Sequence, residues 1–212
     1  MDINLEILLR NYETYLGFLE SKLIKFFASQ KPFIFCKKGC AKCCQKAQFP
    51  YSLLEIKYLL SGFLLLDKET QQKIEDNLQA VAAKKKKFRG KNFRYDCPFL
   101  IDNVCSVYKY RGVICRTFGL MTNNGEGKIK SPFCSELGLN YSNVLNARKN
   151  HISVRKYKKL GVKEEPLGFN VGYKYLTSED FEESFNIKFG DKKPLIDWFL
   201  EDNTKYVENP VD

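Results

Sequence analysis

Four of the chain's eight cysteines fall within nine residues, in the stretch Cys36-Lys-Lys-Gly39-Cys40-Ala-Lys-Cys43-Cys44. A cysteine binds a soft or borderline metal as its thiolate, and short spacers let successive sulfurs reach one ion without the ordering of a large loop. The two-residue spacer between Cys40 and Cys43 is typical of such a metal-binding turn. Gly39 can adopt the positive φ that a tight turn around a metal needs. This stretch therefore predicts a thiolate metal site.

The other four cysteines follow within the next 90 residues of the chain, at Cys97, Cys105, Cys115 and Cys134. The first 35 and the last 78 residues contain none, so we take all eight cysteines as candidate ligands of one site region. A disulfide framework and reactive free thiols are the alternatives. Against disulfides, eight cysteines in 212 residues fall short of the roughly 8–10% of a disulfide scaffold, and the acidic N-terminus does not resemble a secretory signal.

The sequence leaves the metal open, because sites built from cysteine alone serve zinc, iron and iron–sulfur clusters. Neighbouring side chains diverge in a helix and in a strand, so we expect Cys43 and Cys44 to serve different ions or a polynuclear cluster. Eight thiolates divide into two shells of four. One shell would combine Cys36, Cys40 and either Cys43 or Cys44 with a single cysteine from the group at 97–134. This predicts about two zinc ions or one multi-iron cluster for each chain.

The surrounding sequence predicts mostly helical elements around these cysteines. Apolar spacing indicates a long amphipathic helix over residues 4–28, which should end before Pro32. Helices are also expected over 51–60, where Ser52 and Glu55 can form a capping box, and over 67–83. Segment 97–108 predicts a hairpin around Asp102 and Asn103 that brings two cysteines together.

Further along the chain, a short helix over 109–118 should carry Cys115, and a turn at 123–127 should return the chain toward Cys134. Segment 141–160 is weakly helical, and Ser178 and Pro194 each start a plausible short helix. We therefore expect an α+β fold that is mainly α, with a long N-terminal helix and short helices around a small Cys-rich metal core that contains a hairpin. Residues 1–212 should form one domain, with the metal core at 36–134 and a helical C-terminal extension at 141–212.

The net charge of +10 favours an acidic partner, either a protein or a nucleic acid. Segment 84–94 combines Lys and Arg with Phe88 and Phe93, which could contact phosphates and stack on bases. The favoured interpretation of this basic run is a solvated helix end, where cations suit the helix dipole. The longest apolar run, near residues 63–66, is too short for a bilayer. We expect a cytoplasmic protein without a membrane partner, in which thiols stay reduced unless a metal binds them.

The cysteine pattern resembles a known family, the YkgJ-like cysteine-cluster proteins, with the signature Cys-x-x-Cys-x-x-Cys-Cys and a domain described as zinc- or iron-chelating. The segments Cys97-Pro-Phe-Leu and Cys105-Ser-Val-Tyr108-Lys-Tyr-Arg111-Gly-Val-Ile-Cys115-Arg116 are similar to the family's second motif. Two departures are a three-residue spacer after Cys36 and Gly112 at a position where proline is usual, which should loosen the start of the following helix. The resemblance covers 36–134 and implies that all eight cysteines belong to the site, with Tyr108, Arg111 and Arg116 as structural residues or partners of the ligands.

Our first functional hypothesis is a metal-binding module whose zinc or iron–sulfur centre folds the domain, or stores or senses the metal. The alternative is an iron–sulfur enzyme that modifies protein lysines, because flagellin lysine methylases resemble this family in their cysteine cluster. Nucleic-acid binding through 84–94 ranks third. Whether the chain is an enzyme stays open, since His151 is its only histidine and lies outside the cluster. No glycine-rich turn for S-adenosylmethionine or a dinucleotide is present, and acid or base chemistry would have to come from Glu55, Asp96 or a tyrosine.

Overall fold

The computed structural model describes residues 3–37, 39–46, 48–123, 129–146 and 151–200. Its α-helices are α1 (Ile3–Ser29), α2 (Leu53–Phe63), α3 (Lys68–Lys87), α4 (Val113–Thr117), α5 (Val154–Leu160), α6 (Tyr173–Leu176) and α7 (Glu179–Phe185). Short 3-10 helices are η1 (Lys31–Phe33), η2 (Cys44–Lys46), η3 (Tyr108–Tyr110), η4 (Phe133–Leu137) and η5 (Leu195–Phe199). The strands are β1 (Pro50–Ser52), β2 (Leu100–Ile101), β3 (Val104–Cys105), β4 (Met121–Asn123), β5 (Ile129–Lys130), β6 (Leu145–Asn146), β7 (His151–Ile152), β8 (Gly168–Phe169) and β9 (Lys192–Pro194).

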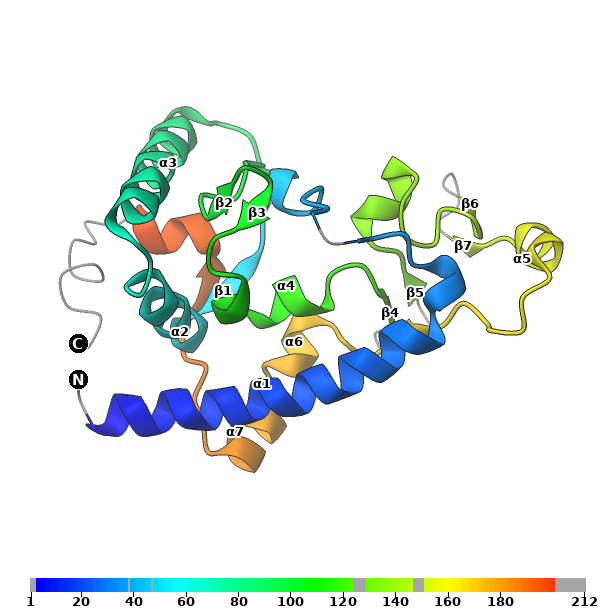
Figure 1. The fold of residues 1–212 in the computed structure, drawn as a ribbon, viewed down its shortest axis with the longest axis horizontal. Helices are drawn as coiled ribbons and strands as arrows, with labels where there is room; N and C mark the ends of the chain where they lie inside the picture. Colours follow the sequence, from blue (N-terminus) through cyan, green and yellow to red (C-terminus); the bar gives the residue numbers. More distant parts are fainter. Residues whose placement is uncertain (1–2, 38, 47, 124–128, 147–150, 201–212) are drawn as a thin grey trace.

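Helix α1 runs along one side of the molecule and supports the segments above it (Figure 1). The predicted apolar face is buried against α2, α4, α6 and α7, through Tyr12, Tyr15, Leu16, Leu19 and Leu23. The hydroxyl of Tyr15 donates to the carbonyl of Leu176, with 2.6 Å between the oxygens. The helix ends before Pro32, as predicted, because the residue before a proline avoids helical dihedrals.

Helices α2 and α3 lie together with η5 at one end of the molecule, above the N-terminal part of α1 (Figure 1). The predicted capping box is present: the Ser52 hydroxyl accepts from the Glu55 N–H, and the Glu55 carboxylate accepts from the Ser52 N–H. Such a reciprocal cap satisfies two N–H groups at the helix start. Helix α3 starts in the same manner, since the Asp67 carboxylate accepts from the Thr70 N–H at 2.8 Å.

The described residues form four small sheets, and two of these join segments that are far apart in the sequence. Strand β1 pairs antiparallel with β9, and β4 pairs antiparallel with β5 and parallel with β8. The hairpin β2–β3 and the pair β6–β7 are local. Residues 141–200 therefore contain strands as well as helices, and two of those strands complete sheets that begin in the first 123 residues. The division into a metal core and an extension stays a prediction.

The secondary structure predicted after residue 97 is partly confirmed. The hairpin is confirmed, and Asp102 and Asn103 both take positive φ, at 49° and 62°. The helix expected over 109–118 is instead η3 and α4, because Arg111 and Gly112 between them are extended. In 141–160 only α5 is helical, since β6 and β7 occupy the earlier part. Ser178 precedes α7, Pro194 precedes the 3-10 helix η5, and the turn at 123–127 lies mostly outside the described residues.

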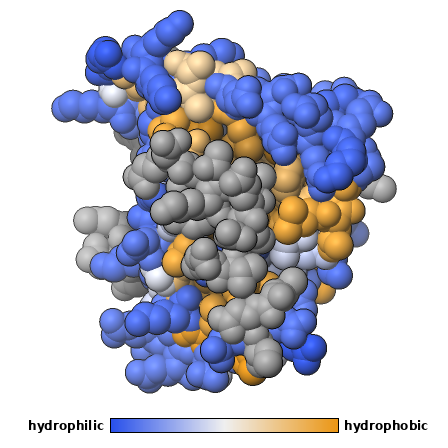
Figure 2. Space-filling view, turned by 90° about the vertical axis from the view of Figure 1, so that its left-hand side faces the viewer, coloured by the Kyte–Doolittle hydropathy of each residue, from blue (hydrophilic) through white to orange (hydrophobic). Residues whose placement is uncertain are grey.

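The fold class is confirmed as α+β and mainly α, with a long N-terminal helix. Within the described residues, no helix combines the length and apolar character that a membrane span requires. The end of the molecule seen in Figure 2 mixes apolar and hydrophilic side chains. Leu64 and Leu65, directly after α2, are among the exposed apolar residues.

Candidate metal centre

The cysteine loop, defined here as residues 36–46, is a series of tight turns. The N–H of Cys40 donates to the Lys37 carbonyl at 2.9 Å, and the N–H of Cys44 donates to the Ala41 carbonyl at 2.9 Å. Gly39 has a φ of +87°, as the sequence predicted, and this left-handed conformation suits glycine. The turns bring the thiols of Cys36 and Cys40 into hydrogen-bonding contact.

Asn140 holds the start of this loop in place. Its side-chain oxygen accepts from the N–H groups of Phe35, at 2.9 Å, and Cys36, at 2.8 Å. Its side-chain N–H donates to the Gly119 carbonyl at 2.9 Å. Asn140 is fully buried and follows η4, which carries Cys134. One amide therefore ties the first cysteine to the segments around the last one.

The β2–β3 hairpin places two further cysteines beside the cysteine loop. Cys105 pairs with Leu100 in the hairpin, and the N–H of Cys97 donates to the Cys44 carbonyl at 2.8 Å. The charge of a Cys105 thiolate acts on Cys97, so the expected proximity of these two thiols is present. The cysteine group at 97–134 thus contacts the cysteine loop through a backbone hydrogen bond.

Cys115, in α4, rests on the fully buried side chain of Tyr51. The Tyr51 hydroxyl oxygen lies 3.2 Å from the Cys115 sulfur and 3.1 Å from the N–H of Gly112, which donates to it. Glu55 fixes the same helix start, because its carboxylate accepts from the Val113 N–H at 2.8 Å. These contacts position Cys115 from β1 and α2.

Gly112 fits this site as glycine. A Cβ at residue 112 would lie 2.7 Å from Cε1 of Tyr51 and 2.8 Å from Oε1 of Glu55, and both side chains are buried. A proline would also lack the N–H that Tyr51 accepts. The departure from the family's proline therefore does not loosen the start of α4, because Tyr51 and Glu55 hold it.

The thiols influence one another in two groups. The principal charge effects join Cys36, Cys40 and Cys134 to each other, and they separately join Cys44, Cys97, Cys105 and Cys115. Cys43 acts on members of both groups. Because the thiolates affect one another's pKa, cysteines from four segments of the chain lie in the same region of the fold as Cys43.

Burial disfavours the thiolate form at most of these positions. Desolvation raises the pKa of Cys36 to about 12, of Cys115 to about 12 and of Cys134 to about 11. Burial likewise raises the pKa of Cys97 and Cys105, and the hydrogen bond with Cys43 raises that of Cys44. That same hydrogen bond lowers the pKa of Cys43 to about 7, with help from the Arg111 charge. A bound metal cation would instead favour the thiolate form, since a coordinating thiol is deprotonated.

Two features show that this donor set fits a metal. The sulfurs of Cys43 and Cys44 are 3.8 Å apart, which matches the edge of a sulfur tetrahedron with metal–sulfur bonds of about 2.3 Å. The Nε–H of Arg111 is buried without a partner, although the guanidinium acts electrostatically on Cys43 and Cys105. Such a donor suits a metal-bound thiolate. In the part of the chain described, no three His, Cys, Asp or Glu groups already surround one point, so binding would draw the sulfurs closer.

The expectation that the side chains of Cys43 and Cys44 point away from each other is wrong, because their sulfurs are 3.8 Å apart. The two residues lie where a turn passes into η2, so neither helical nor strand geometry separates their side chains. Their sulfurs can share one ion or bridge two.

The other residues singled out in the sequence lie in different settings. His151 is exposed in β7, and Asp96 is exposed before the hairpin. Glu55 is fully buried, and desolvation raises its pKa against the hydrogen bonds it accepts from Ser52, Val113 and Tyr173. It is therefore a packing residue rather than an accessible acid.

The basic run 84–94 is largely exposed. Its Lys85 is an exception to the solvated helix end, since it forms an ion pair with Asp197 at 2.6 Å. Arg116 is buried and stabilises the backbone beside the cysteines, whereas Tyr108 is 65% exposed under the Arg111 guanidinium.

The sequence interpretation missed Tyr51 and Asn140. Tyr51 is the first residue of the helix predicted over 51–60, and its position after Pro50 is the only local signal at this residue. Asn140 follows Gly138 and Leu139 without a motif. Their roles depend on contacts across 64 and 104 residues, which local patterns do not encode.

Residues 35–135 match one family model, described as "CxxCxxCC: Putative zinc- or iron-chelating domain". This match contains all eight cysteines and confirms the resemblance to a cysteine-cluster domain of the zinc- or iron-chelating kind. Searches of curated proteins and of solved structures gave no significant match.

Proposed function

We propose that this chain, whose residues 35–135 form a domain of the CxxCxxCC family, holds zinc or iron through its cysteine thiolates and uses the metal to fold the region 36–134. The observation that carries the proposal is the set of contacts among the cysteine-bearing segments: the sulfurs of Cys43 and Cys44 are 3.8 Å apart, and the N–H of Cys97 donates to the Cys44 carbonyl at 2.8 Å. Buried thiols with raised pKa values are poor at staying ionised on their own, and a metal ion supplies the missing positive charge.

We assign the ligands to two shells of four. The first contains Cys36, Cys40, Cys43 and Cys134, and the second contains Cys44, Cys97, Cys105 and Cys115. The electrostatic grouping supports this division, and the 3.8 Å between the sulfurs of Cys43 and Cys44 brings the two shells into contact. Tyr51 would donate to the Cys115 thiolate, and Arg111 to Cys43 or Cys105, which would disperse the negative charge of eight thiolates.

A structural role is supported by the small size of the strands and the helix beside the cysteines. Strands β2, β3 and β5 have two residues each, and α4 has five. Isolated hairpins are marginal in water, whereas a structural zinc site can contribute on the order of 10 kcal/mol to folding. The metal would therefore join the cysteine loop, the hairpin and α4 into one unit.

The test is elemental analysis of protein purified without oxygen, beside its absorption spectrum. We expect about two zinc ions per chain, or iron with absorption near ~400 nm if the centre is an iron–sulfur cluster. Cys40→Ser and Cys97→Ser should each lose metal from one shell. Ser106→Ala, next to a proposed ligand, is the matched control and should keep the full content.

Metal-free wild type would refute the proposal. Full metal retention in both serine variants would refute the eight-ligand assignment. Retention in one variant alone would leave a single-shell centre.

A further inference from the structure

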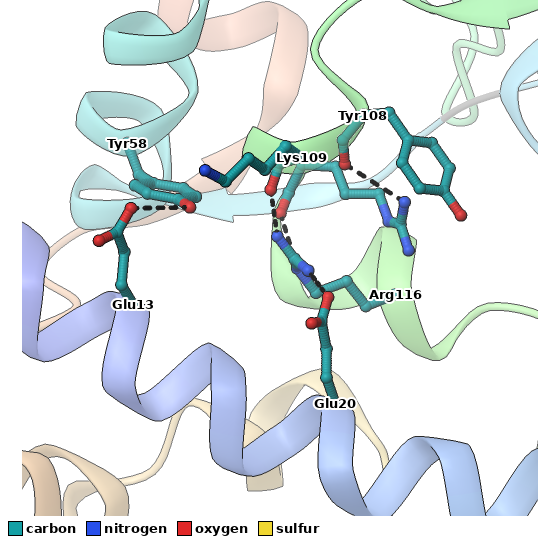
Figure 3. A network of polar contacts seen from close by, with 7 residues as sticks. Glu13, Glu20, Tyr58, Tyr108, Lys109 and Arg116 are labelled. Atoms are coloured by element: carbon teal, nitrogen blue, oxygen red, sulfur yellow. Dashed lines mark hydrogen bonds and ion pairs between the residues drawn. The ribbon is translucent and has the colours of Figure 1, made fainter.

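A groove of about 400 Å³ lies beside the candidate metal centre, between α1 and the segment that joins Cys105 to Cys115 (Figure 3). One wall is a single stripe of α1, at residues Glu13, Leu16, Gly17 and Glu20. The other wall consists of Tyr58 from α2 and of Tyr108, Lys109, Arg111 and Arg116. No proposed metal ligand lines it.

Arg116 fixes the two walls relative to each other. Its side chain is only 5% exposed and forms an ion pair with Glu20 of α1. Its remaining N–H groups donate to the carbonyls of Arg111, at 3.1 Å, and Lys109, at 2.5 Å. A buried guanidinium satisfied on three sides is a structural clamp. The groove is therefore a formed feature, and Arg116 and Glu20 are already occupied.

Gly17 forms part of the α1 wall of the groove and lies in the interior of this 27-residue helix. A Cβ at this position would meet no atom within 4 Å, so no packing contact requires glycine here. Glycine in a helix interior is destabilising by roughly 0.5–1 kcal/mol relative to alanine. What the missing side chain provides at this position is open space in the groove.

The groups that remain available carry opposite charges on opposite walls. On the α1 wall, the Glu13 carboxylate has one long hydrogen bond, from the Tyr58 hydroxyl at 3.4 Å. On the facing wall, the Lys109 ammonium lies 5.7 Å from the centre of the Tyr110 ring, whereas Arg111 is held against Tyr108, 3.6 Å from the ring centre and donating to the Tyr108 carbonyl at 3.2 Å. Among the described residues, neither Lys109 nor Arg111 forms an ion pair. Figure 3 shows Glu13 and Lys109 at the same end of the groove.

We propose that this groove binds a small zwitterion, namely an α-amino acid or a compound with an amino-acid head group. Its ammonium would pair with Glu13, and its carboxylate with Lys109. A ligand with only one sign of charge would meet a like charge on one wall, whereas a zwitterion complements both. The volume is at the small end of ligand sites, which suits a metabolite rather than a folded partner. This inference goes beyond the metal-binding function and does not depend on it.

The first experiment uses the full chain as purified, with its metal content measured in the same samples. The 20 common L-amino acids are screened by thermal shift, and the best one is titrated by calorimetry beside its N-acetyl and α-carboxamide derivatives. The N-acetyl form lacks the ammonium, and the carboxamide lacks the carboxylate. We expect saturable binding of the amino acid and at least tenfold weaker binding of each derivative.

Variants then locate the binding. Gly17→Leu should fill the groove and abolish binding without lowering the melting temperature, because leucine is a good helix former and its Cβ would meet no atom within 4 Å. Ser21→Leu, on an exposed part of α1 outside the groove, is the matched control. Glu13→Gln should remove the preference for the free ammonium, whereas Glu6→Gln, near the start of α1, should leave binding unchanged.

Absence of binding by any amino acid would overturn the proposal, as would equal binding of the derivatives. Undiminished binding by Gly17→Leu would place the ligand elsewhere and would overturn it too. Loss of metal without loss of binding would count against the proposed function alone.

Discussion

Replacing Tyr51 with phenylalanine removes one oxygen atom from beneath Cys115 and leaves the ring in place. That oxygen accepts the N–H of Gly112 at 3.1 Å and lies 3.2 Å from the Cys115 sulfur. Tyr51 is 2% exposed, so water does not readily replace the lost hydroxyl. The carbonyl of Tyr51, which accepts from the Trp198 indole N–H at 3.0 Å, is untouched by the change.

The two lost contacts both belong to the folded, metal-loaded protein. An unpaired buried N–H is destabilising by about 1–3 kcal/mol. Loss of a donor to a metal-bound thiolate typically lowers metal affinity about 10–100-fold, which is a further ~1.4–2.7 kcal/mol. We therefore expect Tyr51→Phe to lower the free energy of unfolding of the metal-loaded protein by about 2–6 kcal/mol.

Urea unfolding of the metal-loaded protein measures this value, and competition with a chelator measures the metal affinity separately. Tyr108→Phe is the matched control, because its side chain belongs to the segment between Cys105 and Cys115 but is 65% exposed. It should change the stability by less than about 0.5 kcal/mol. If Tyr51→Phe behaves like this control in both measurements, the contact with Cys115 does not support the metal centre and the reasoning fails.

Removal of the metal should largely unfold the region 36–134, seen as a loss of circular dichroism, and an unchanged spectrum of demonstrably metal-free protein would contradict this. Metal affinity should fall as the pH is lowered, because the thiols whose pKa is raised to about 11 or 12 must release protons to bind, and chelator competition across pH 6–8 would measure this. Glutamine at Lys84 to Lys87 should leave metal content unchanged and lower stability by less than about 1 kcal/mol, mainly through the Lys85 ion pair; salt-sensitive RNA binding lost in this variant would instead revive the nucleic-acid hypothesis. Gly112→Pro should lower the melting temperature, since it adds a clash and removes an N–H, and an unchanged melting temperature would argue against the contacts of Tyr51.

Local sequence signals predicted those parts of the fold that depend on neighbouring residues. The capping box at Ser52 and Glu55 and the positive φ of Asp102, Asn103 and Gly39 follow from side-chain and backbone preferences over a few residues. The apolar stripe of α1 likewise identified its buried face. The turn at Gly39 lies between Cys36 and Cys40, and the turn at Asp102 and Asn103 lies between Cys97 and Cys105.

Long-range contacts could not be predicted in this way. The pairing of β1 with β9 joins residues 50–52 to 192–194, and each strand has only three residues. The role of Asn140 could not be predicted, because an asparagine after a leucine is ordinary in a loop. Its role comes from hydrogen bonds to the backbone of Cys36 and Gly119, which are distant in the sequence. The divergence expected for Cys43 and Cys44 failed because it assumed regular secondary structure where the chain turns.

The antiparallel pairing of β1 with β9 gives the protein an optical reporter. Residue 198, which follows β9, is the chain's single tryptophan, and its buried indole donates to the Tyr51 carbonyl. The hydroxyl of the same tyrosine contacts Cys115. Indole emission therefore originates one residue away from the candidate metal centre, and a change in emission on metal loading would follow the ordering of that centre in real time, without any added label.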